Sequence, residues 1–240
     1  MTDKEVDSIL KRAAEIPHAV DGAVVQQVSQ MVLRSLRPVR PLPSPGVLAL
    51  GLQVIFIIVA ILGATLLGFN GVHVLTGAES ALLFWVLGSV ARLASSAGAA
   101  EMVPGSKTLI DPWILLASCT GVFAVVFLVL FHDFRLDRFV AEGINCLAIG
   151  LLDAGTAGFL LWLVLRRGLI LHPIAAGVAI GTLAGLAGLG MLELHCPILK
   201  AMHLMVWHIA VIPLSGLAGY LAGRLAQDLG RKRRLAEFMQ

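Results

Sequence analysis

Six long apolar runs constrain this chain more than any other feature. They cover residues 47–68, 78–99, 110–131, 140–165, 173–192 and 203–223, and each provides the roughly 17–25 residues that a helix needs to cross a bilayer. The chain is 58% hydrophobic and only 14% charged, whereas soluble domains carry about 25% charged residues. The sequence therefore predicts an all-α, polytopic membrane protein built as a six-transmembrane-helix bundle over residues 46–223.

The distribution of Lys and Arg predicts which side of the membrane each loop faces. Of the 18 basic residues, 14 fall in the N-terminal segment, the loops after the second and fourth runs, and the tail, residues 224–240. Arg135, Arg138 and Lys200 lie on the other side, and Arg92 lies inside the second run. Since cytoplasmic loops carry the excess of basic residues, we expect both termini to be cytoplasmic. The membrane accounts for the positive charge, so no direct nucleic-acid partner is expected.

Residues 1–45 form a short amphipathic segment ahead of the first run. Apolar side chains recur there at steps of three and four residues, which predicts two short helices separated near Pro17. A stretch with four prolines at residues 38–45 follows and is expected to be extended. The apolar positions that are candidates for binding a partner are Val6, Ile9, Leu10, Ala13, Val24, Val28, Met31 and Val32.

Helices this short cannot bury enough surface to be stable alone. Their apolar faces could cover the membrane surface, a second copy of the chain, or another protein. The first helix is not strongly basic and its apolar face includes alanines, which makes it a weak membrane insert. We therefore favour a cytoplasmic protein partner.

The connection between the last two runs, residues 191–208, concentrates the side chains that could carry chemistry. Acids, imidazoles and thiols beside a membrane core are costly unless they are paired, solvated or used. Glu193 and Lys200 also lie in this connection, and Cys146 lies about two turns into the fourth run from the same side. The candidates for sensing or redox chemistry are Cys146, Cys196, His195, His203 and His208.

Three interpretations of these residues remain open: a Cys146–Cys196 thiol pair or disulfide, a metal site, and plain interfacial polarity. If Pro197 begins a helical turn, then Cys196, Lys200 and His203 share one face and His208 lies off it. The spacing matches no standard zinc or copper pattern, so we predict no metal and no cofactor. A Cys–His catalytic pair lacks any inferable oxyanion donor, so an enzyme is not expected.

Two further features lie inside the runs. Arg92 could pair with Asp153 in the membrane, or its guanidinium could reach the interface instead. Gly177, Gly181 and Gly185 recur every four residues, as do Gly219 and Gly223. Small residues at this step let helix backbones approach closely, so we expect the fifth and sixth spans to pack tightly.

The sequence resembles the NrsF-like integral-membrane anti-sigma factors, a family of regulators in the bacterial inner membrane. The resemblance rests on Leu-Arg-Pro-Val-Arg-Pro-Leu-Pro at residues 36–43, on the six spans, and on Leu-His-Cys-Pro at residues 194–197. His203, Trp207 and His208 follow that element, and Cys146 lies where the family places its other membrane cysteine. The segment before Arg34 is longer than in the simplest members.

The resemblance implies that the cytoplasmic segment holds an extracytoplasmic-function sigma factor away from RNA polymerase. It also implies that a signal at the outer Cys/His residues releases that sigma factor. No His-x-x-x-Cys-x-x-Cys zinc motif precedes the first span, so zinc is not expected in the cytoplasmic segment. The alternative function is a membrane redox or metal-handling protein that uses the same residues, and the sequence leaves the oligomeric state open.

Overall fold

The computed structural model describes residue 11 and residues 22–35, 43–103, 105–106, 110–168 and 170–238. The chain divides into two compact units, Met1–Pro41 and Leu42–Gln240. In the first unit, α2 covers Gly22–Ser35, which confirms the second of the two predicted N-terminal helices. Lys11 is helical. The candidate binding residues predicted in the first helix, Val6, Ile9, Leu10 and Ala13, lie outside the described residues.

The second unit contains six helices that are long and apolar enough to cross a membrane, which confirms the predicted fold class. The first five are α3 (Pro45–Leu67), α4 (Gly77–Ala100), α5 (Pro112–Leu130), α6 (Phe139–Leu165) and α7 (Pro173–His195). The sixth, Ala201–Lys232, joins α8 (Ala201–His203), the π-helical turn η1 (Leu204–His208) and most of α9 (Ile209–Phe238).

Proline and a capping motif determine where four of the spans begin. Pro45, Pro112 and Pro173 occupy the first turns of α3, α5 and α7, where the missing N–H costs nothing. Before α4, the Thr76 hydroxyl accepts from the Glu79 N–H, and the Glu79 carboxylate accepts from the Thr76 N–H at 2.8 Å. This is a capping box. These local signals explain why the spans begin within two residues of the predicted positions.

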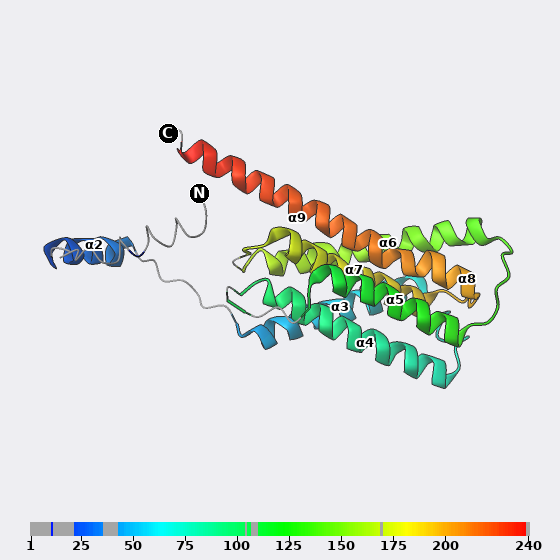
Figure 1. Cartoon of the computed structure of the whole chain (residues 1–240). Helices are drawn as coiled ribbons and strands as arrows, with labels where there is room; N and C mark the ends of the chain where they lie inside the picture. Colours follow the sequence, from blue (N-terminus) through cyan, green and yellow to red (C-terminus); the bar gives the residue numbers. More distant parts are fainter. Residues whose placement is uncertain are drawn as a thin grey trace. The chain divides into compact units, whose positions relative to one another are not determined.

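α7 is the central helix of the bundle (Figure 1). Every residue from 178 to 193 is buried, and α7 contacts α3, α4, α5, α6 and α9. A helix that is apolar all round is buried on every side, and ten of the 23 residues of α7 are Gly or Ala. A displacement of α7 would therefore change its packing against five neighbouring helices.

Glycines allow α7 and α9 to pack backbone to backbone, as predicted. A Cβ atom added to Gly177 would collide with the Gly219 carbonyl oxygen, and one added to Gly181 would collide with the Ser215 carbonyl oxygen. A Cβ atom on Gly223 would lie 2.9 Å from the Ile174 Cα. These contacts confirm that the small residues bring the fifth and sixth spans together.

The spans alternate in direction, so the bundle has two ends. The Cys196 end holds the loops at residues 68–76, 131–138 and 196–200, and the His172 end holds the opposite loops. At the Cys196 end, the Gly71 N–H donates to the Leu194 carbonyl at 3.1 Å, and the Ala201 N–H donates to the Asp133 carbonyl at 2.7 Å. The first bond fastens the loop at residues 68–76 to the C-terminal end of α7, and the second fastens the loop at residues 131–138 to the start of α8.

Candidate functional site

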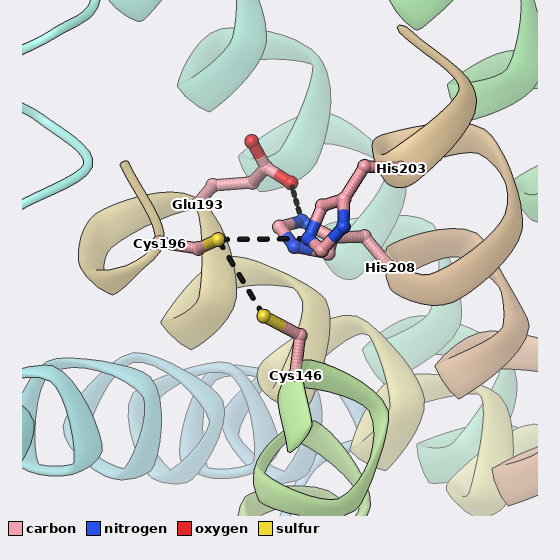
Figure 2. Close-up of polar contacts among 5 residues, drawn as sticks. All are labelled: Cys146, Glu193, Cys196, His203 and His208. Atoms are coloured by element: carbon pink, nitrogen blue, oxygen red, sulfur yellow. Dashed lines mark hydrogen bonds and ion pairs between the residues drawn. The ribbon is translucent and has the colours of Figure 1, made fainter. Parts of the chain in front are cut away.

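Four thiol and imidazole side chains meet at the Cys196 end of the bundle (Figure 2). Cys146 comes from α6, Cys196 directly follows α7, His203 is the last residue of α8, and His208 is the last residue of η1. One Sγ or ring nitrogen from each residue lies within 4.8 Å of all the others. We call these four residues the Cys/His cluster. Cys196, His203 and His208 are buried, whereas Cys146 is half-buried.

Pro197 explains why the chain leaves the axis of α7 at this point. The residue before a proline is disfavoured in the helical conformation, and Cys196 is extended, with φ −79° and ψ 119°. Its N–H still donates to the Leu192 carbonyl at 2.7 Å. Residues 196–200 are not helical and the next helix begins at Ala201, so the predicted helical turn starting at Pro197 is wrong.

The π-helical turn η1 brings two histidines together that an α-helix would keep apart. Five residues separate His203 from His208, which is about 140° around an α-helix. In η1 the Ile209 N–H donates to the Leu204 carbonyl five residues earlier, and the wider turn brings the two rings to a centroid distance of 5.1 Å. Single π turns often occur at functional sites. The prediction that His208 lies off the shared face was therefore wrong.

A buried contact with a carboxylate holds the ring of His208. Its Nδ1 lies 2.6 Å from Glu193 Oε1, and these side chains are 0% and 1% exposed. Nε2 of the same ring is buried and has no hydrogen-bond partner among the described residues. Figure 2 shows the ring next to the thiols, with Glu193 on its other side. Glu193 thus orients His208 so that its free nitrogen faces the cluster.

The two thiols lie close together without forming a disulfide. Cys146 Sγ is 3.5 Å from Cys196 Sγ, and Cys196 Sγ is 3.7 Å from His203 Nε2. The contact with Cys146 and burial raise the pKa of the Cys196 thiol, and the contact with His203 opposes this rise. Cys119, the third cysteine, is buried in α5 and lies outside the cluster.

Three polar neighbours of the cluster serve the surrounding loops. His195 Nδ1 donates to the Gly68 carbonyl at 3.0 Å, which ties the α3–α4 loop to α7. The Lys200 ammonium donates to the Asp137 carbonyl at 3.1 Å. Trp207 packs on Phe139 with ring centroids 5.4 Å apart. The structure therefore brings together four of the five predicted sensing residues and places His195 beside them.

The predicted Arg92–Asp153 pair does not occur in the described part of the chain. Arg92 is exposed and lines a cavity with Gly46, near the start of α3. Asp153 packs against Gly63, about 25 Å further along the same helix at 1.5 Å per residue. Its Oδ2 atom is buried without a hydrogen-bond partner in the described residues. Arg92 and Asp153 do not pair because their side chains lie at different depths in the bundle.

The model of the family NrsF, negative regulator of sigma F, matches residues 33–226. The chain belongs to the NrsF family. The match covers the first five membrane-spanning helices, most of the sixth, and all four residues of the Cys/His cluster. Neither the curated proteins nor the solved structures contain a match to the chain. Membership makes the protein a negative regulator of a sigma factor, with a sigma factor as its partner.

In this NrsF-family chain, α2 carries exposed apolar side chains on one face. Val28 is 50% exposed, Met31 is 59% exposed and Val32 is 51% exposed. Val24 lies in the same helix, although its side chain is outside the described set. Gln26 and Gln30 occupy the opposite face. The amphipathic pattern predicted for this segment is therefore confirmed from Gly22 to Ser35.

The pairing of Glu193 with His208 is what the sequence reasoning missed. Glu193 lies in α7 three residues before Cys196, which places both on the same side of the helix. The sequence already marked Glu193 as an acid beside the membrane core. Its partner could not be named from the sequence because the π turn repositions His208.

Proposed function

We propose that this protein is an anti-sigma factor of the bacterial inner membrane that binds an extracytoplasmic-function sigma factor. Residues 1–45 bind the sigma factor in the cytoplasm, and a change at the Cys/His cluster on the outer side releases it. The protein acts by binding and not by catalysis. Membership of the NrsF family is the observation that carries this proposal.

The exposed apolar face of α2 supports the assignment of the binding segment. Val25, Val28 and Met31 are each at least half exposed, and helices of this kind commonly place their apolar face in a groove of a partner protein. The excess of basic residues at the termini supports a cytoplasmic position for both ends of the chain.

The packing of α7 supports a route from the cluster to the rest of the bundle. Cys146 belongs to α6 and Cys196 to the end of α7, so a change in the distance between the two thiols moves these helices against each other. They touch at Gly150 and Gly188, where no side chain separates the backbones. Contacts between small residues allow packed helices to slide by small steps, and α7 in turn contacts α3, which follows the binding segment.

Binding is tested with the full-length protein in detergent micelles and the sigma factors encoded in the same genome. The variant Val28→Glu/Met31→Glu places two charges on the apolar face of α2. Its matched control, Gln26→Glu/Gln30→Glu, adds the same charge on the opposite face. We expect the parent and the control to retain one sigma factor and the apolar-face variant to lose it. Retention of no sigma factor by the parent would refute the proposal.

Sensing is tested by replacing the thiols one at a time. Because Cys146 Sγ and Cys196 Sγ are in contact, Cys146→Ser and Cys196→Ser should change sigma-dependent transcription to the same extent in cells. Cys119→Ser is the matched control, since this thiol lies outside the cluster, and should leave transcription unchanged. Unequal effects of the two cluster variants would contradict a shared role.

A further inference from the structure

We propose that the Cys/His cluster is a zinc site in which Cys146, Cys196, His203 and His208 are the four ligands and Glu193 orients one of them. This inference goes beyond the proposed function and does not depend on it. The spacing of the residues along the chain gave no metal motif. The argument therefore starts from the three-dimensional arrangement of the donor atoms.

The donor atoms have the composition and the separations of a tetrahedral zinc site. Zinc in structural sites takes four sulfur or imidazole ligands, with Zn–S of about 2.3 Å and Zn–N of about 2.0 Å. Those bond lengths place two sulfurs about 3.8 Å apart and a sulfur and a nitrogen about 3.5 Å apart. The corresponding distances here are 3.5 Å for Cys146 to Cys196 and 3.7 Å for Cys196 to His203.

The remaining separations also allow the four ligands to close around one ion. None of the selected donor atoms is more than 4.8 Å from another. Bringing the most distant pair to tetrahedral separation needs each side chain to move by about 1 Å or less. The ligands are attached to three different segments, α6, the end of α7 and the α8–η1 turn, so the ion would join these segments.

His208 gives an observation that is independent of the clustering. Its Nε2 atom is fully buried without a hydrogen-bond partner among the described residues, although buried polar atoms are almost always satisfied. Its Nδ1 atom is held by Glu193 at 2.6 Å. A histidine that binds a metal commonly gives its other ring nitrogen to a carboxylate, which fixes the ring and makes it a stronger ligand. A cation bound to Nε2 satisfies the unpaired atom.

Charge and softness favour zinc among the metals that take such ligands. Two thiolates balance the charge of a divalent ion, and the nearby basic side chains bond elsewhere: the Lys200 ammonium donates to the Asp137 carbonyl, and Arg135 pairs with Asp133. A tetrahedral set of two sulfurs and two nitrogens is typical of zinc. All four positions are filled by protein, as in a structural site, with no position left for a substrate.

The test measures metal in the full-length protein, purified in detergent with a tag that contains no histidine. We expect about one zinc per chain by mass spectrometry, and a loss of most of it in Cys146→Ser, Cys196→Ser and His208→Asn. Cys119→Ser and His195→Asn are the matched controls, because they remove a thiol and an imidazole outside the ligand set, and they should keep the zinc.

A second measurement covers the case in which the ligand variants do not fold. Cobalt(II) replaces zinc in the parent protein, and thiolate ligation in a tetrahedral site gives a charge-transfer band in the near ultraviolet and strong visible absorption. Less than about a tenth of an equivalent of zinc in the parent, iron or copper in its place, or a cobalt spectrum without thiolate bands would overturn the inference. Sigma-factor retention is measured separately, so zinc binding and sigma binding can fail independently.

Discussion

Two acid–imidazole pairs lie at opposite ends of this bundle and differ in almost everything but their chemistry. At the Cys196 end, Glu193 and His208 are 2.6 Å apart and 1% and 0% exposed. At the His172 end, Glu101 and His172 are 3.9 Å apart, with His172 77% exposed and Glu101 7% exposed. A pair with one exposed partner is screened by water and contributes little, whereas a pair buried on both sides cannot lose one partner without leaving a charge in the interior. Burial of the imidazole thus separates the two pairs.

The largest expected effect comes from removing the imidazole of each pair. His208→Ala should destabilise the protein by about 3–5 kcal/mol, because it leaves the Glu193 carboxylate buried and unpaired. His172→Ala should change stability by less than about 0.5 kcal/mol, as expected for an exposed side chain. Unfolding in mixed micelles measures both, with a chelator present so that metal does not contribute. Equal losses of stability in the two variants would show that burial does not distinguish the two acid–imidazole pairs.

The next effect separates the roles of the two acids. If Glu193 positions His208 as a zinc ligand, Glu193→Gln should weaken zinc binding by about 10–100-fold while one zinc still binds at saturation. Competition with a chromophoric chelator gives the affinity. Glu101→Gln is the matched substitution at the other end and should leave the affinity unchanged. A Glu193→Gln protein with the affinity of the parent would remove the positioning role.

The loops at the two ends give a smaller difference. A Cβ atom on Gly71 would lie 2.8 Å from the Cys196 carbonyl oxygen, whereas Gly105 has open space around it and a φ of +78°. Asparagine tolerates positive φ. We therefore expect Gly71→Asn to cost about 1–3 kcal/mol through crowding, and Gly105→Asn to cost less than about 1 kcal/mol. The same unfolding measurement checks both, and a reversed order would contradict the close approach at the Cys196 end.

The smallest expected effect is a pH dependence of the unfolding free energy that comes from Glu101 at the His172 end. Burial raises the pKa of the Glu101 carboxyl, and the charge of His172 opposes the rise. The folded protein then holds this proton to higher pH than the unfolded chain does. The stabilisation from this proton is complete below the pKa of the glutamate in the unfolded chain. It is lost as the pH rises through the higher pKa of Glu101 in the folded protein. Glu101→Gln should flatten this decline in unfolding free energy, whereas parallel curves for parent and variant would contradict it.

The sequence was sufficient for features that depend on local chemistry. Proline at the first turns of α3, α5 and α7 and the capping box before α4 are readable from neighbouring residues, so the spans could be predicted closely. The glycines of α7 and α9 were also informative, because a step of four residues in an apolar helix defines a face without knowledge of its partner.

The sequence was insufficient where geometry depends on the neighbouring helices. An α-helix with 3.6 residues per turn would place His208 away from His203, whereas the π turn brings the two rings together. Arg92 and Asp153 appeared compatible because each was placed from the ends of its own span, and the sequence does not give the axial offset between spans. The role of Glu193 follows from its contact with His208, and no pattern along the chain encodes a contact that spans fifteen positions and a change in helix type.

α8, η1 and α9 run without interruption from Ala201 to Phe238, and this continuity has a mechanical consequence. At 1.5 Å per residue the rod is about 57 Å long, nearly twice the thickness of the hydrocarbon core. A tilt of about 5° at the histidines would swing its distal tip by about 5 Å. A small tilt of the helix near His203 and His208 would thus become a displacement of its distal end by about one helical turn.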